Sequence, residues 1–139
     1  MWPFRRRRAP QIDCVTLAEV CESEADYPVF TVGQSRLTDS FAALEFSSDS
    51  PTRFLPGTIV PIIDPSMNKV ADLEIRIEGH VVGYLRPPAL DAAISSLATH
   101  SARTLQVPVM LLSTPAGPEV RVHACLSGPI ADDELADDR

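Results

Sequence analysis

The stretch from residue 70 to residue 85 constrains the fold most strongly, because apolar and charged side chains alternate along it. Apolar residues occupy every second position from Leu73 to Ile77, and charged residues lie between them. This period of two is typical of a β-strand with one buried face and one wet face. Glu78-Gly79 then favours a tight turn, and residues 80–85 return as a second strand. The sequence therefore predicts a β-hairpin with Glu74, Arg76 and Glu78 on its solvent side.

Four further strands are expected around this hairpin. Residues 27–33, 58–63, 105–112 and 120–126 are rich in β-branched and aliphatic side chains and are bounded by turn residues. Pro61 marks the second of these as an edge or bulged strand, and Pro56-Gly57 before it predicts a loop. Residues 115–118 predict a hairpin loop between the last two strands. In the final strand the side chains that share one face are Val120, Val122, Ala124 and Leu126, with Arg121, His123 and Cys125 on the other.

Two helices complete the predicted order of strand, helix, three strands, helix and two strands. Asp39 is expected to cap a short helix over residues 40–44, which places Phe41 and Leu44 on one side. The second helix covers residues 89–98, where Leu90, Ile94 and Leu97 recur at helical spacing. These elements predict a mainly β, α+β fold: a small curled antiparallel sheet or an open OB-like barrel with two helices.

The composition limits the classes of function. A chain of 139 residues suffices for one domain. The domain is expected at residues 27–130, between a mobile arm at 1–26 that is first basic and then acidic and an acidic tail at 131–139. The net charge of −7 opposes wholesale coating of nucleic acid but leaves room for a local site.

The location and the chemistry follow from what the sequence lacks. No apolar run is long enough to span a membrane, and no apolar leader follows the arginines at 5–8, so we expect a cytoplasmic protein. The strong preference for arginine over lysine is typical of a GC-rich bacterial genome. Three cysteines cannot all pair within the chain, and we expect free thiols. Neither metal-ligand spacing nor a nucleophile–base pattern is present, so we expect no metal, no cofactor and no enzymatic activity.

Three local patterns make the chain similar to the HIRAN domain, a small β-rich module found alone in bacteria or fused to DNA-remodelling enzymes. The first is residues 30–33, Phe-Thr-Val-Gly, which looks like the opening strand of that family. The second is residues 77–85, with a glycine turn followed by valine, glycine, an aromatic residue and leucine. The third is the ending at residues 120–130, where a strand leads into Ser-Gly-Pro-Ile. The resemblance covers roughly residues 27–130.

This resemblance implies binding of single-stranded DNA, including free 3′ ends, by the loop after the first strand and the loop before the central hairpin. Carried onto this chain, the candidate binding residues are Gln34, Arg36, Asn68, Lys69, Tyr84 and Arg86. The chain departs from the family pattern before the hairpin, where Val70 and Ala71 stand at the tyrosine and aspartate positions. Since base stacking on aromatic rings contributes about 1–3 kcal/mol per base, the resemblance implies a weakened pocket.

Other interpretations of the same residues remain open. Arg36, Lys69 and Arg86 also fit ordinary surface charge, Asn68 fits a turn residue that bonds its own backbone, and Tyr84 fits a ring that covers the core. The arginine arm fits a frayed segment as well as a contact with nucleic acid or a membrane surface. The alternative function is a protein-interaction module that binds through the sheet edge near Pro61 or through the arm. The sequence gives no indication of the oligomeric state.

Overall fold

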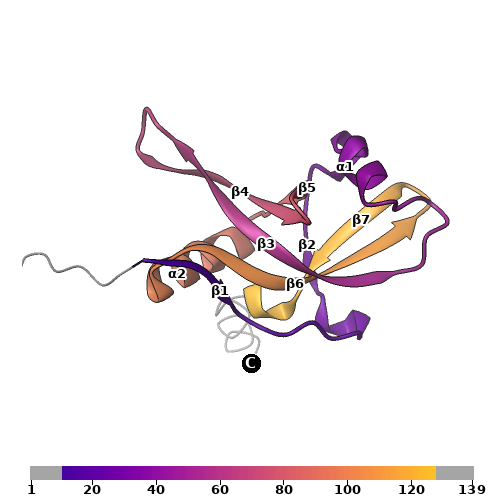
Figure 1. The fold of residues 1–139 in the computed structure, drawn as a ribbon, viewed down its shortest axis with the longest axis horizontal. Helices are drawn as coiled ribbons and strands as arrows, with labels where there is room; N and C mark the ends of the chain where they lie inside the picture. Colours follow the sequence, from indigo (N-terminus) through magenta and orange to yellow (C-terminus); the bar gives the residue numbers. More distant parts are fainter. Residues whose placement is uncertain (1–10, 128–139) are drawn as a thin grey trace, which may run out of the picture.

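A computed structural model describes residues 11–127, which form a curled and mostly antiparallel sheet with two helices (Figure 1). The expected α+β class is confirmed. The strands are β1 (Ile12–Thr16), β2 (Val29–Phe30), β3 (Arg53–Asp64), β4 (Lys69–Ile77), β5 (His80–Tyr84), β6 (Ala102–Thr114) and β7 (Gly117–Val122). The helices are α1 (Thr38–Ala43) and α2 (Ala89–His100), with short 3-10 turns η1 (Glu24–Asp26), η2 (Gln34–Arg36) and η3 (Ala124–Leu126).

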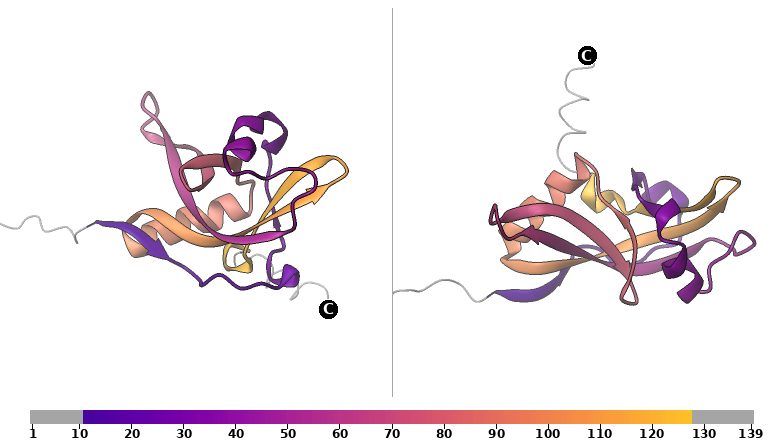
Figure 2. Two further views of the ribbon diagram at one scale, coloured as in Figure 1. Left: turned by 45° about the vertical axis from the view of Figure 1, so that its right-hand side comes forward. Right: turned by 90° about the horizontal axis from the view of Figure 1, so that it is seen from above.

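The two long strands β3 and β6 organise the sheet, whose order is β2-β7-β6-β3-β4-β5. Strand β3 pairs with β6 from Arg53 to Ile59 and with β4 from Thr58 to Asp64. It therefore passes from one neighbour to the other along its length, and this change accompanies the strong curl visible in Figure 2. An isolated antiparallel bridge joins Val32, just after β2, to Tyr84 at the end of β5. The two ends of the strand order are thus brought together, as in a small barrel.

The predicted central hairpin is confirmed. β4 and β5 pair in antiparallel fashion, and the turn falls at Glu78 and Gly79, both with positive φ. Such a turn matches the right-handed twist of the two strands. Leu73, Ile75 and Ile77 are at most 1% exposed. Glu74 was expected on the wet face but is only 7% exposed, because it lies between two neighbouring strands and forms an ion pair with Arg76.

Pro61 fits the prediction of an edge or bulged strand. It lies beyond Ile59, where pairing with β6 ends, so this part of β3 has β4 on one side only. The register also shifts between Ile62 and Ile63, which is the signature of a bulge. The predicted loop at Pro56-Gly57 is wrong, because both residues lie within β3. Pro56 faces Pro108 of β6, and two prolines can face each other only where the ladder needs no hydrogen bond from them.

The end of the last predicted strand is also corrected. β7 stops at Val122, and residues 124–126 form η3 because the imidazole Nδ1 of His123 accepts a hydrogen bond from the Cys125 N–H at 2.9 Å. Ala124, which was expected to point inward, is exposed, whereas Leu126 is fully buried. The hairpin between β6 and β7 is confirmed, but its turn covers only residues 115–116, because Gly117 and Pro118 already belong to β7.

Helix α1 begins earlier than expected. Leu37 takes the N-cap position and Asp39 lies within the first turn, where its carboxylate favours the positive end of the helix dipole. Phe41 and Leu44 are buried as predicted. Helix α2 was predicted correctly and continues to His100; Ala89 and Ala93 are its buried residues, while Leu90, Ile94 and Leu97 are half-buried against the core.

The segment assigned to an arm contributes to the sheet. Residues 12–16 form β1, which pairs in parallel with β6, Ile12 lying opposite Ala102. Tyr27 is fully buried; its hydroxyl donates a 2.6 Å hydrogen bond to the Cys21 carbonyl oxygen. The predictions for the arginine cluster and the acidic tail lie outside the described residues. Within residues 11–127, no helix is long and apolar enough to cross a membrane.

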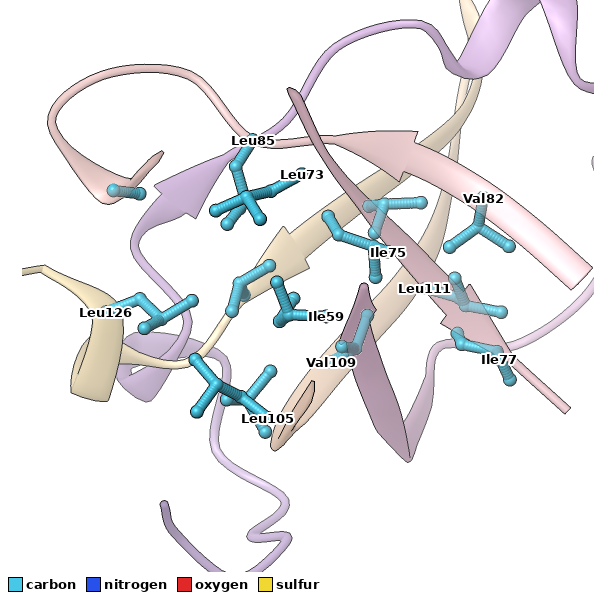
Figure 3. Packing of buried hydrophobic residues seen from close by; sticks show 14 of the residues in the cluster. Ile59, Leu73, Ile75, Ile77, Val82, Leu85, Leu105, Val109, Leu111 and Leu126 are labelled. Carbon is cyan, nitrogen blue, oxygen red and sulfur yellow. The ribbon is translucent and has the colours of Figure 1, made fainter. Parts of the chain in front are cut away.

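Aliphatic side chains from β3 to β7 fill the interior of the curled sheet (Figure 3). Ile59, Leu105 and Leu111 have no exposed surface, and burial of side chains of this size stabilises the fold by about 1.5–3 kcal/mol each. α2 closes one side of this core through its contacts with β6 and η3, and α1 packs near β5.

Candidate nucleic-acid interface

An exposed aromatic ring lies on the outer face of the sheet, where β2 pairs with β7. Phe30 of β2 is 59% exposed, although its neighbour Val29 packs against the core. Strand alternation explains the difference, because successive side chains point to opposite faces. Phe30 lies opposite Arg121 of β7, whose guanidinium carbon is 4.8 Å from the ring centroid. Arg121 is oriented by a hydrogen bond from its Nε to the Glu119 carboxylate at 3.0 Å.

Phe30 also borders a groove of about 280 Å³, which we call the Phe30 groove. Its apolar walls come from the proline pair at 87–88 and from Leu126, and Arg86 supplies an exposed cation. Two elements distant in the sequence thus place an aromatic ring and a guanidinium along one depression. The residues that line the Phe30 groove are Pro28, Val29, Phe30, Arg86, Pro87, Pro88, Ala89, Leu126 and Ser127.

Tyr84 shares the outer face with Phe30. It lies opposite Val32 in the closing bridge, with backbone hydrogen bonds of 2.9 and 3.1 Å, and Val32 is two residues after Phe30. Residues two apart on an extended chain point to one side, and residues paired in an antiparallel bridge share a face, so Phe30 and Tyr84 are placed on the same face. The tyrosine ring covers Gly33, where an added Cβ would come within 2.8 Å of the ring carbon Cδ2.

The loop after Gly33 was predicted to bind the ligand through Gln34 and Arg36. Both residues lie in η2, which begins directly after Gly33, where the left-handed φ of +93° turns the chain, and which contacts β7. The Gln34 amide donates a hydrogen bond to the Thr31 hydroxyl, which in turn donates to the Val120 carbonyl oxygen at 2.8 Å. Gln34 therefore has a structural role, whereas Arg36 is exposed.

Asn68 and Lys69 lie elsewhere, at the tip of the β3–β4 hairpin. This tip projects away from α1 in Figure 1 and in the left view of Figure 2. Lys69 is five positions along β4 from Glu74, the partner of Tyr84, which corresponds to about 16 Å of strand. Asn68 adopts a positive φ and donates its N–H to the Asp64 carbonyl oxygen at 2.7 Å, as a turn residue does. The loop before the central hairpin, which the resemblance assigns to binding together with the loop after Gly33, therefore lies apart from that loop (Figure 1).

The sequence analysis missed Phe30 and Arg121 as site residues. Each was placed on a strand, and Arg121 on the face opposite Val120 and Val122, but their meeting depends on the β2–β7 pairing. The sequence carries no local sign of that pairing.

The thiol of Cys125 is half-buried in η3. Burial raises the pKa of the Cys125 thiol to about 11, which disfavours the thiolate. All three cysteines are free. No group of three or more His, Cys, Asp and Glu side chains within residues 11–127 is placed to hold a metal ion.

Comparison with known proteins gives no assignment: no family model, no curated protein and no solved structure matches this chain.

Proposed function

We propose that the domain binds single-stranded nucleic acid on the outer face formed by Phe30, Tyr84, Arg86 and Arg121. The observation that carries the proposal is Phe30, a ring 59% exposed with a guanidinium 4.8 Å from its centroid, beside a groove that contains a second arginine. Aromatic platforms for bases and cations for phosphates are what such binding requires. The proposal is for binding alone, without catalysis.

The charge of the chain decides what kind of binding this surface permits. With a net charge of −7, long-range attraction to a polyanion is absent, so affinity must come from local contacts. Stacking contributes about 1–3 kcal/mol per base and changes little with salt. Each phosphate contact on a single strand adds about 0.7 to the salt slope, which is the fall in the logarithm of the binding constant per unit of the logarithm of the salt concentration. We expect a short footprint and a shallow salt dependence.

The resemblance to the HIRAN domain, which stays a prediction, suggests the first probe: a labelled single-stranded DNA with a free 3′ end. Its binding can be followed by fluorescence anisotropy at several salt concentrations. We expect Phe30→Ala to weaken binding by about 5-fold to 150-fold, the equivalent of one lost stack. The matched control is Met67→Ala, because Met67 is 58% exposed but lies at the distant tip of the β3–β4 hairpin.

Replacement of Arg86 tests the electrostatic contribution. We expect Arg86→Ala to lower the salt slope by about 0.7. Arg103→Ala removes the same charge at an exposed site outside the Phe30 groove and should leave the salt slope unchanged. If the unmodified protein shows no binding at low salt, or if both arginine variants behave alike, the nucleic-acid proposal is wrong. The protein-interaction alternative would then stand.

A further inference from the structure

A second groove, of about 780 Å³, lies between the β3–β4 hairpin and α2, and we call it the hairpin–helix groove. It exists because β3 leaves β6 after Ile59 and stays paired only with β4, so the two long strands diverge. α2 fills part of the resulting wedge. The apolar side chains along the groove are Pro61, Ile63, Val70, Ile94, Leu97, Ala98 and Ala102.

This groove exposes apolar surface that a folded chain usually covers. Ile63 is 52% exposed, and Leu97 and Ile94 are only half-buried although they belong to the inner side of α2. The adjoining edge of β3 also has no strand beside it among the described residues. An apolar depression next to an open strand edge is a surface that favours an extended segment with apolar side chains.

The chain itself supplies such a segment at the mouth of the groove. β1 runs parallel to β6, and Ile12 lies opposite Ala102, so the chain before Ile12 emerges beside Ala102. Gln11 and Ala102 both line the hairpin–helix groove. Residues 1–10 begin Met-Trp-Pro-Phe and continue with four arginines. Ten extended residues reach at most about 35 Å, several times the roughly 6 Å length of the helical turn at 94–98.

We propose that residues 1–10 bind the hairpin–helix groove of their own chain, with Trp2 and Phe4 as the apolar anchors. The tether makes this contact intramolecular, and a short linker gives an effective concentration on the order of millimolar. A contact too weak to hold a free peptide is therefore populated when the segment is attached. Arg103 is the charged residue in the groove lining, so the contact depends on the apolar anchors and not on charge attraction.

The test uses Trp2, the single tryptophan of the chain, as the reporter. In the full-length protein we expect its emission to lie at shorter wavelength than that of N-acetyltryptophanamide. We also expect the acrylamide quenching constant to be reduced by roughly half or more, since a docked indole buries much of its surface. Ile63→Thr and Ala98→Gln, both at exposed lining positions, should each return the emission and the quenching toward the free values.

The matched control is Ile62→Thr, the same substitution one position earlier on β3. Ile62 is 37% exposed and lies outside the groove lining, so this variant should retain the shielded emission. Circular dichroism establishes that all three variants are folded. Fully hydrated emission in the unmodified protein, or equal shielding in Ile63→Thr and Ile62→Thr, would overturn the proposal. Shielding that fades on dilution together with a dimer in sedimentation would show that the segment binds a second copy, which also overturns it.

Discussion

Gly57 offers a sharp test of how closely β3 packs on β6. This residue lies in the part of β3 that the sequence assigned to a loop, and it faces the core. A Cβ atom at position 57 would lie 2.5 Å from Cγ2 of Val109, a side chain with no exposed surface. Carbon atoms prefer separations of about 3.5–4.0 Å, so Gly57→Ala requires a movement of about 1 Å. Val109 cannot rotate away easily, because branching at Cβ restricts its χ1 angle.

Two opposing effects set the size of the change. Replacing glycine by alanine restricts the unfolded chain, which stabilises a protein by about 0.4–1 kcal/mol where the native backbone accepts alanine. Gly57 has no left-handed φ, so this gain applies. Overpacking a dense core costs about 1–3 kcal/mol. We therefore expect Gly57→Ala to lower the free energy of unfolding by about 0.5–2 kcal/mol, measured as a lower urea midpoint at constant m-value.

A double-mutant cycle separates this clash from other causes. Val109→Ala alone should cost about 2 kcal/mol, because it leaves a cavity in the core. In the double variant the new methyl group at position 57 enters that cavity, so the two losses should fall short of additivity by about 1–2 kcal/mol. Additive losses, or a Gly57→Ala variant as stable as the parent, would refute the packing of β3 on β6 described above.

Two further variants test the contacts around Tyr27. Tyr27→Phe removes the hydroxyl that donates to the Cys21 carbonyl oxygen and should cost about 0.5–1.5 kcal/mol in urea unfolding at neutral pH. Burial, together with a hydrogen bond to the Cys21 side chain, raises the pKa of Tyr27 from 10.0 to about 12. The folded state therefore favours the neutral phenol. The contribution of this phenol to the free energy of unfolding is full below pH 10 and should be lost between about pH 10 and 12. Unfolding titrations across that range should fall more steeply for the parent than for Tyr27→Phe. His123→Ala removes the acceptor for the Cys125 N–H and an edge-on contact with Tyr27, whose ring centroid lies 5.6 Å from that of His123. This variant should lower the free energy of unfolding by about 1–2 kcal/mol. His123→Asn should recover part of that loss, because asparagine is also a capping residue.

The central hairpin was predictable because its information is local. The alternation from Leu73 to Ile77 and the turn at Glu78-Gly79 lie within a few residues of one another, so no distant contact is needed to specify them. The second helix was predictable for the same reason.

The errors came from residues whose neighbours are distant in sequence. Pro56 signals a loop locally, yet β3 accepts it because its partner across the ladder is another proline. The alternation that suggested a strand to residue 126 continues by chance past Val122, where the imidazole of His123 starts η3 instead. No local sequence pattern predicts β1, because its partner β6 follows some ninety residues later.

The candidate interface depends on such distant contacts more than the fold does. Phe30 is exposed because β2 pairs with β7 in a register that places Arg121, and not a core residue, beside its ring. A register slipped by one residue would turn Phe30 inward and expose Val29, since the side-chain period is two. The Val32–Tyr84 bridge fixes that register from the other side, and Gly33 permits it by leaving room for the tyrosine ring. Barrel closure and the exposed aromatic surface therefore have one cause, and a change that opens the bridge should weaken both.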